Sequence, residues 1–126
     1  MNYAIAQAAE RSGLSIDTLR YYERIGLVDP PARDSGGRRA YTDADLGWLE
    51  FLTKLRTTGM PIRMMREYAQ LKDSPGAAMR RRQMLVDHRK DVLERIAELQ
   101  TSLDALNHKI GLYDDQLCPP TQAAAG

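Results

Sequence analysis

Apolar residues recur at alternating steps of four and three along the last third of the chain, and this pattern constrains the fold more than any other feature. The stripe consists of Leu85, Val92, Ile96, Leu99, Leu103, Leu106, Ile110, Tyr113 and Leu117, with Arg89 as its polar position. Such spacing puts a narrow apolar seam on one long helix and is typical of a coiled coil. A helix of about 40 residues is about 60 Å long, so the seam needs a partner helix to cover it. We therefore expect residues 75–118 to join two copies of the chain as a homodimer, and the spacing leaves the relative direction of the two helices open.

The first part of the chain is instead divided by glycine and proline into short segments. Helical spacing of apolar residues predicts one helix over residues 3–11 and a second over residues 16–25. Ser12-Gly13 would form the turn between them, and Ser15 is a good N-cap for the second helix. Two short helices joined by a tight turn outline a helix-turn-helix, whose second helix is the usual candidate for the major groove of DNA.

A basic loop follows the second helix, in which arginines crowd around a glycine pair: Arg33, Gly36-Gly37, Arg38 and Arg39. The stretch has no apolar periodicity, which favours an exposed loop. Short segments at residues 27–28 and 39–41 predict two strands around this loop, although Pro30 and Pro31 keep the first one short. The pattern indicates a wing beside the helix-turn-helix.

Three further helices are predicted after the wing. Thr42 and Asp45 resemble a capping box at the start of a helix that ends at Gly59. A helix over residues 61–71 follows, and Ser74-Pro75 supplies an N-cap and a first-position proline for the long last helix.

Charge and composition narrow the function classes. The chain has 18 Lys and Arg against 17 Asp and Glu, a net charge of +1, so any basic binding surface must be local. Cys118 is the single cysteine, which excludes an intrachain disulfide, and no apolar run is long enough to span a bilayer or act as a signal peptide. His88 and His108 lack the fixed partners that a catalytic or metal site needs. We expect a cytoplasmic protein that is no enzyme, with no cofactor, no metal and no membrane partner, and a disordered tail over residues 119–126.

Three segments of the first part resemble the DNA-binding-domain signatures of the MerR family of bacterial transcription regulators: Ser15–Leu27, Gly37–Leu46 and Leu55–Ile62. The likeness extends over residues 3 to about 72, and the long helix is similar to the dimerisation helix of short family members. The resemblance implies a mainly α protein, with a winged helix-turn-helix DNA-binding domain at residues 1–72 and an antiparallel coiled-coil helix at residues 75–118.

The resemblance also implies how such a dimer works. It would bind a pseudo-palindromic operator inside an overlong promoter spacer and, on receiving a stress or small-molecule signal, bend and untwist the DNA so that RNA polymerase engages both promoter elements. The DNA contacts that the resemblance assigns are Thr18, Arg20, Tyr21 and Tyr22 on the recognition helix, Arg33, Arg38, Arg39 and Tyr41 on the wing, and Lys54 and Arg56 on the next helix.

The signal itself stays open at this point. The sequence resembles most a subgroup of the family that responds to aldehydes and other electrophiles. Lys54 occupies the position at which that subgroup has its reactive cysteine. Cys118 could serve as a thiol or metal sensor, although it has no second cysteine nearby and the negative end of a helix dipole disfavours a thiolate. The alternatives are a constitutive DNA-bending protein or repressor with no effector, and a purely structural coiled-coil adaptor.

Overall fold

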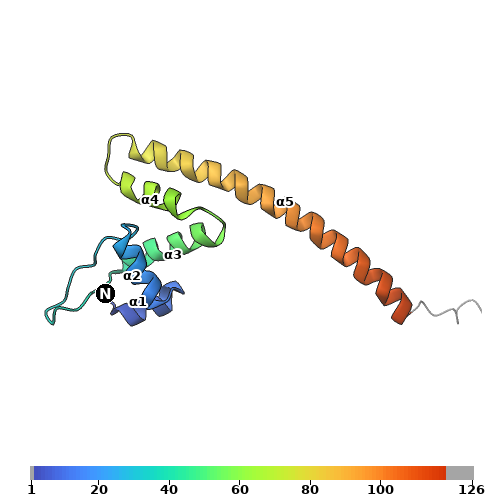
Figure 1. Ribbon diagram of the computed structural model, residues 1–126, viewed down its shortest axis with the longest axis horizontal. Coiled ribbons are helices and arrows are strands. Elements are labelled where there is room, and N and C mark those ends of the chain that lie inside the picture. Colours follow the sequence, from blue (N-terminus) through green and yellow to red (C-terminus); the bar gives the residue numbers. More distant parts are fainter. Residues whose placement is uncertain (1, 119–126) are drawn as a thin grey trace, which may run out of the picture. The chain divides into compact units, whose positions relative to one another are not determined.

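The computed structural model describes residues 2–118, and these residues are mainly helical (Figure 1). The elements in chain order are α1 (Ile5–Ser12), α2 (Ile16–Arg24), α3 (Asp43–Thr57), α4 (Ile62–Leu71) and α5 (Ala77–Leu117). The chain divides between His88 and Arg89 into two compact units, so that α5 begins in the first unit and continues through the second. None of the described helices is long and apolar enough to cross a membrane. The predicted disordered tail, residues 119–126, lies outside the described residues.

The predicted helix-turn-helix is confirmed in α1 and α2. Gly13 ends α1 with φ at 78°, a left-handed conformation that glycine adopts without a steric penalty. The Ser15 side chain caps α2, because its Oγ accepts a hydrogen bond of 3.0 Å from the backbone N–H of Thr18. Since α1 packs against both α2 and α3, the turn fixes the orientation of α2 on the core.

Helix α3 is the central helix of the first unit. Its capping box is confirmed: Thr42 Oγ1 accepts from the Asp45 N–H at 3.2 Å, and Asp45 Oδ2 accepts from the Thr42 N–H at 2.9 Å. Four of its leucines are buried: Leu46, Leu49, Leu52 and Leu55. These side chains pack with buried residues of α1, α2 and α4 in one core cluster.

We expect Thr42→Ala to lower the free energy of unfolding by about 1 kcal/mol, because the substitution removes one half of the capping box. Urea denaturation of the two proteins at equal concentration measures the difference. Thr57→Ala, an exposed threonine at the other end of α3, is the control and should change stability by less than about 0.5 kcal/mol. Equal effects of the two substitutions would contradict the assignment of the cap.

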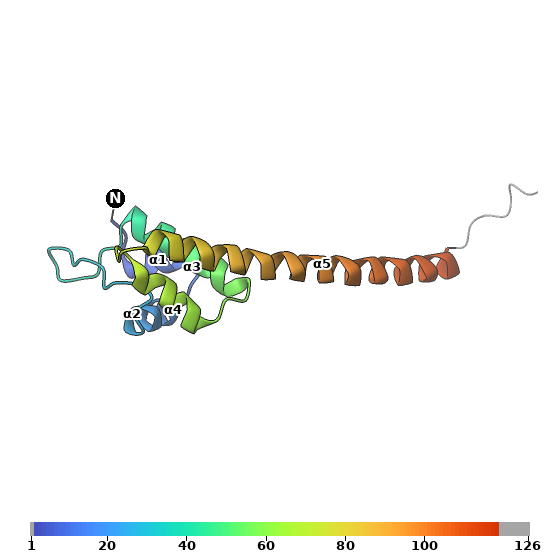
Figure 2. The same cartoon turned by 90° about the horizontal axis from the view of Figure 1, so that it is seen from above.

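The prediction of two strands in the wing is wrong. Among the described residues, extended pairing is limited to two isolated antiparallel bridges, Arg33 with Arg39 and Tyr3 with Tyr41. The reason is that Pro30 and Pro31 have no backbone N–H to donate, so the pairing cannot extend back toward α2. The wing is therefore a loop that projects from the helices of the first unit in both views (Figures 1 and 2).

The predicted start of the last helix at Ser74-Pro75 is also wrong, since α5 begins at Ala77. Gly76 has φ at 75°, which lies outside the helical region, so a right-handed helix cannot begin before it. The backbone carbonyl of Ser74 accepts from the Ala77 N–H at 2.9 Å and closes this turn.

The seam of α5 is largely exposed in the second unit. Seven of its side chains there are between 47 and 80% exposed: Ile96, Leu99, Leu103, Leu106, Ile110, Tyr113 and Leu117. Val92 is half-buried. Leu85, predicted as the first seam position, instead packs half-buried against the core cluster of its own unit. The unpartnered apolar stripe thus begins after the first unit ends.

Candidate nucleic-acid interface

Helix α2 has one face in the core and one face in solvent. Leu19 and Tyr22 are buried, with 2% and 4% of their surface exposed, whereas Arg20 is exposed and Tyr21 is 40% exposed. Successive residues of a helix lie about 100° apart, so Tyr21 and Tyr22 point to different faces of α2. The Arg24 guanidinium lies 5.4 Å from the centre of the Tyr21 ring, a cation–π contact that the sequence reading missed.

Two tyrosines predicted as DNA contacts have their rings in the core. Burial raises the pKa of the Tyr22 and Tyr41 hydroxyls, so both stay neutral phenols. Tyr41 exchanges two backbone hydrogen bonds with Tyr3, at 2.7 and 2.8 Å, which ties the end of the wing to the start of the chain. Both side chains are therefore buried in the single chain, and their contacts with DNA stay a prediction.

Asp34 organises the tip of the wing, a role that the sequence reading also missed. Its Oδ1 accepts from the backbone N–H groups of Gly36 at 2.8 Å and Arg38 at 3.0 Å. Gly37 adopts φ of 78°, and its carbonyl accepts from Arg33 Nη1 at 2.7 Å. An aspartate that bonds to backbone N–H groups two residues ahead is a common turn signal and marks this position in the sequence.

Arg38 and Arg39 differ sharply in their surroundings. The Arg38 side chain is exposed. Arg39 forms a two-point ion pair with Glu23 of α2, with Nη2 3.1 Å from Oε1 and Nε 2.9 Å from Oε2. The hydrogen bond to Glu23 raises the pKa of the Arg39 guanidinium further above its usual value.

Lys54 and Arg56 lie exposed in the last turn of α3. Both positive charges are favourable there because the helix dipole is negative at this end. Arg56 Nη1 reaches the Met60 carbonyl at 3.5 Å, and the Lys54 carbonyl accepts from Thr58 Oγ1 at 2.6 Å. The two side chains are therefore available on the surface, while their backbone is tied into the turn that leads to α4.

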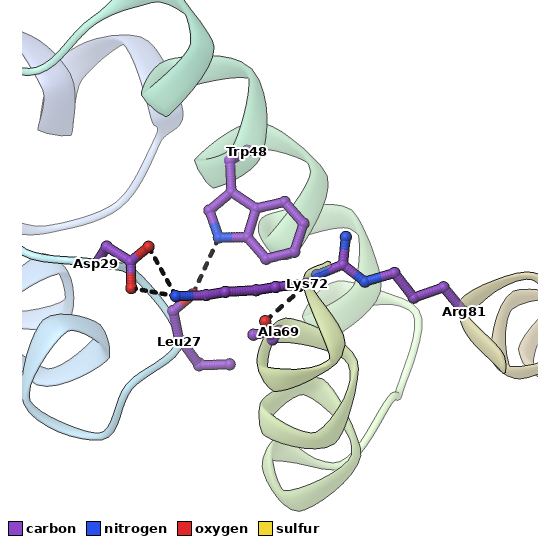
Figure 3. A network of polar contacts seen from close by, with 6 residues as sticks. All are labelled: Leu27, Asp29, Trp48, Ala69, Lys72 and Arg81. Atoms are coloured by element: carbon purple, nitrogen blue, oxygen red, sulfur yellow. Dashed lines mark hydrogen bonds and ion pairs between the residues drawn. The ribbon is translucent and has the colours of Figure 1, made fainter. Parts of the chain in front are cut away.

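A polar network holds the root of the wing against α3, α4 and α5 (Figure 3). Trp48 Nε1 donates to the Leu27 carbonyl at 3.0 Å, and Lys72 Nζ pairs with both carboxylate oxygens of Asp29, at 2.7 and 2.9 Å. Arg81 donates to the Ala69 carbonyl at 3.3 Å, and its guanidinium lies 5.7 Å from the centre of the Trp48 ring. Leu27 and Asp29 connect α2 to the wing, so this network fixes where the wing leaves the core.

The cysteine and the histidines do not converge on one site in the part of the chain that the structure describes. Cys118 is exposed just after the end of α5, and its N–H donates to the Asp114 carbonyl at 2.7 Å. His88 Nε2 lies 2.7 Å from Thr58 Oγ1, a contact within the first unit, and His108 is exposed on α5. Within residues 2–118, no group of three or more histidine, cysteine or acidic side chains is placed to hold a metal ion.

Comparison with known proteins agrees with this geometry. Residues 3–72 match the family described as MerR HTH family regulatory protein, and residues 46–109 match the family described as MerR, DNA binding. An uncharacterized HTH-type transcriptional regulator of Haemophilus influenzae is 38% identical over 114 residues, which cover 90% of this chain and 84% of the relative.

Two crystal structures share the fold. One, from Listeria monocytogenes and described as a MerR family transcriptional regulator, has a TM-score of 0.83 at 37% identity and covers 93% of this chain and 89% of its own. The other, HiNmlR, is described as a MerR family regulator lacking the sensor domain, bound to promoter DNA. It has a TM-score of 0.83 at 35% identity and covers 94% of this chain and 95% of its own. The chain therefore belongs to the MerR family of transcriptional regulators, and it is a DNA-binding regulator rather than an enzyme.

Proposed function

We propose that two copies of the chain bind a pseudo-palindromic operator inside an overlong promoter spacer and activate transcription by bending and untwisting the DNA. The observation that carries this proposal is the joint exposure of Arg20 and Tyr21 on α2 and of Arg38 on the wing, in one compact unit. A recognition helix reads base edges in the major groove, while an adjacent basic loop holds the phosphate backbone. The solved relative bound to promoter DNA supports the same use of this fold.

The residue roles follow from exposure at all positions but Thr18, which is half-buried and keeps its role from the family resemblance. We assign Thr18, Arg20 and Tyr21 to the groove and Arg33, Arg38, Lys54 and Arg56 to phosphates. Tyr22 and Tyr41 would act by packing α2 and the wing onto the core. The DNA-binding domain would comprise residues 1–72, and the dimerisation helix would be α5, Ala77–Leu117.

The exposed seam of α5 supports the dimer, because a stripe of large apolar side chains on a long helix is stable in water when a second helix covers it. We propose an antiparallel pair of α5 helices, which would place the two recognition helices at the two halves of the operator. RNA polymerase would then engage a promoter whose two elements have been brought to a usable spacing by the deformation of the DNA.

The effector is unidentified, and two readings compete. Cys118 is exposed, so it is accessible to an oxidant, an electrophile or a soft metal. Its place just beyond the end of α5, with no second cysteine in the chain, favours instead an effector that acts at a non-thiol site. A constitutive DNA-bending protein or repressor remains the second candidate function if no effector changes transcription.

In vitro transcription tests the proposal, using the promoter of the protein's own gene and the same promoter with its spacer shortened to the usual length. The regulator should activate the overlong promoter and should be dispensable for the shortened one. Adding thiol oxidants, aldehydes and metals to wild type and Cys118→Ser then separates the two effector readings. Loss of the response in Cys118→Ser identifies the thiol, and an equal response excludes it. Activation that ignores spacer length contradicts the proposed mechanism.

We expect Arg20→Ala to weaken operator binding by about 1 to 3 kcal/mol, because it removes an exposed cation of α2 that reaches the groove or its phosphates. Titration of the protein against a labelled operator duplex measures the change. Arg63→Ala removes another exposed arginine, from α4, and serves as the control, with no expected effect. An unchanged operator footprint for Arg20→Ala would remove α2 from its proposed role.

A further inference from the structure

The ion pair between Glu23 and Arg39 differs from an ordinary surface pair in geometry and burial. Two nitrogens of the guanidinium face the two carboxylate oxygens, at 3.1 and 2.9 Å, and the side chains are only 30% exposed for Arg39 and 16% for Glu23. Glu23 Oε2 is buried and makes no hydrogen bond within the described part of the chain. The ion pair with Arg39 Nε is the contact that compensates its negative charge. Two-point arginine–carboxylate pairs fix direction as well as charge, and a buried carboxylate without its cation is costly.

The pair joins two elements, α2 and the wing, that bind the same operator in the proposed function. Glu23 lies in the last turn of α2, three residues after Arg20, and Arg39 lies on the returning arm of the wing, opposite Arg33 in the isolated bridge. Successive side chains of an extended segment point to opposite sides, so Arg39 facing α2 leaves Arg38 facing away from it. The exposure of Arg38 and the partial burial of Arg39 agree with this alternation.

We propose that Glu23 and Arg39 form a clamp that positions the wing against the recognition helix, and that Arg39 is a positioning residue rather than a phosphate contact. The proposal rests on the proposed function, in which α2 and the wing bind the same operator. The clamp serves a second purpose there. A carboxylate beside Arg20 would repel the phosphates of DNA if it were unpaired, and the arginine neutralises it.

Glu23→Gln distinguishes the clamp from a direct contact between Arg39 and a phosphate, because the two hypotheses predict opposite changes in operator affinity. If Arg39 binds phosphate and Glu23 merely competes for it, removing a negative charge strengthens operator binding. If the pair is a clamp, Glu23→Gln weakens operator binding by about ten-fold, because the glutamine cannot hold the guanidinium at two charged points. Binding to random DNA of equal length should stay the same or become tighter.

Arg39→Lys adds a test that keeps the charge. A lysine contacts phosphate well as a point charge but cannot reproduce the two-point pair, so the clamp predicts about ten-fold weaker operator binding. If the pair is a clamp, the exchanged pair Glu23→Arg with Arg39→Glu should bind the operator more tightly than Arg39→Lys does, within about three-fold of wild type. Arg38→Ala is the matched control: as a phosphate contact it should reduce the slope of log K against log salt by about one, whereas Glu23→Gln should leave that slope unchanged.

Amide hydrogen exchange of the free protein tests whether the ion pair holds the wing in the absence of DNA. The Ala40 N–H bonds to the Ala32 carbonyl and the Asp34 N–H to the Arg38 carbonyl, both at 2.8 Å, and both bonds close the wing. These amides should exchange faster in Glu23→Gln and Arg39→Lys than in wild type, and at the wild-type rate in Arg38→Ala. Unchanged exchange in the first two variants, or tighter operator binding by Glu23→Gln, overturns the clamp. Equal affinity of wild type for operator and random DNA would instead overturn the proposed function, while the exchange result still stands.

Discussion

A variant with Leu99→Asp and Leu103→Asp is expected to sediment as a monomer and to lose operator binding. The two leucines are 66% and 47% exposed on α5 of the single chain, so neither supports the fold of its own unit. Burying a leucine against a partner contributes about 1.5 to 3 kcal/mol, and the dimer would contain each leucine twice. Aspartate removes this contribution and adds carboxylates that would have to be buried in the seam.

Operator binding should fall with the dimer because each copy supplies one recognition helix. A single copy reaches one half of the operator, and the loss of the second, linked half is expected to weaken binding by about a hundred-fold or more. Sedimentation velocity measures the assembly, and operator titration at the same protein concentration measures the binding.

The matched control places the same two substitutions on the opposite face of α5. Ala97→Asp with Thr101→Asp keeps the spacing and the added charge at exposed positions that lie outside the seam. This control should remain a dimer and bind the operator as wild type does. If the Leu99→Asp, Leu103→Asp variant also sediments as a dimer, the seam has no part in assembly and the chain dimerises elsewhere.

Local signals explain which parts of the fold could be predicted from the sequence. The cap at Ser15 and the capping box of Thr42 with Asp45 depend on residues within one helical turn, and the structure forms both. The heptad spacing of α5 likewise depends on the periodicity of one helix. Family membership was predictable for a related reason, because its three signatures are contiguous segments.

Tertiary contacts explain what could not be predicted. Glu23 and Arg39 are 16 residues apart, so no local pattern pairs them. Tyr41 enters the core because its backbone pairs with Tyr3 at the start of the chain. Leu85 fits the heptad as well as its neighbours do, and only the packing of the first turns of α5 on the core removes it from the seam. Periodicity identifies an apolar face but does not identify its partner.

Trp48→Ala is expected to lower the free energy of unfolding by about 3 kcal/mol. This value is at the lower end of the range for replacing a buried aromatic residue by alanine, because the Trp48 side chain is half-buried. Its ring stacks on Tyr68 with centres 5.8 Å apart and an interplanar angle of 16°, and it contacts the Arg81 guanidinium. The substitution removes these contacts together with the hydrogen bond to Leu27 that holds the root of the wing (Figure 3).

Trp48→Phe separates the contribution of ring packing to stability from that of the hydrogen bond to Leu27. Phenylalanine keeps an aromatic ring near Tyr68 and Arg81 but cannot donate to the Leu27 carbonyl, so it should cost about 1 kcal/mol. Urea denaturation followed by helical circular dichroism measures both variants, at one fixed protein concentration because dimerisation contributes to stability. If Trp48→Phe costs as much as Trp48→Ala, the hydrogen bond to the wing root dominates and ring packing is secondary. If Trp48→Ala costs less than about 1 kcal/mol, the network does not stabilise the unit, because losing so many contacts from one aromatic side chain should exceed that value.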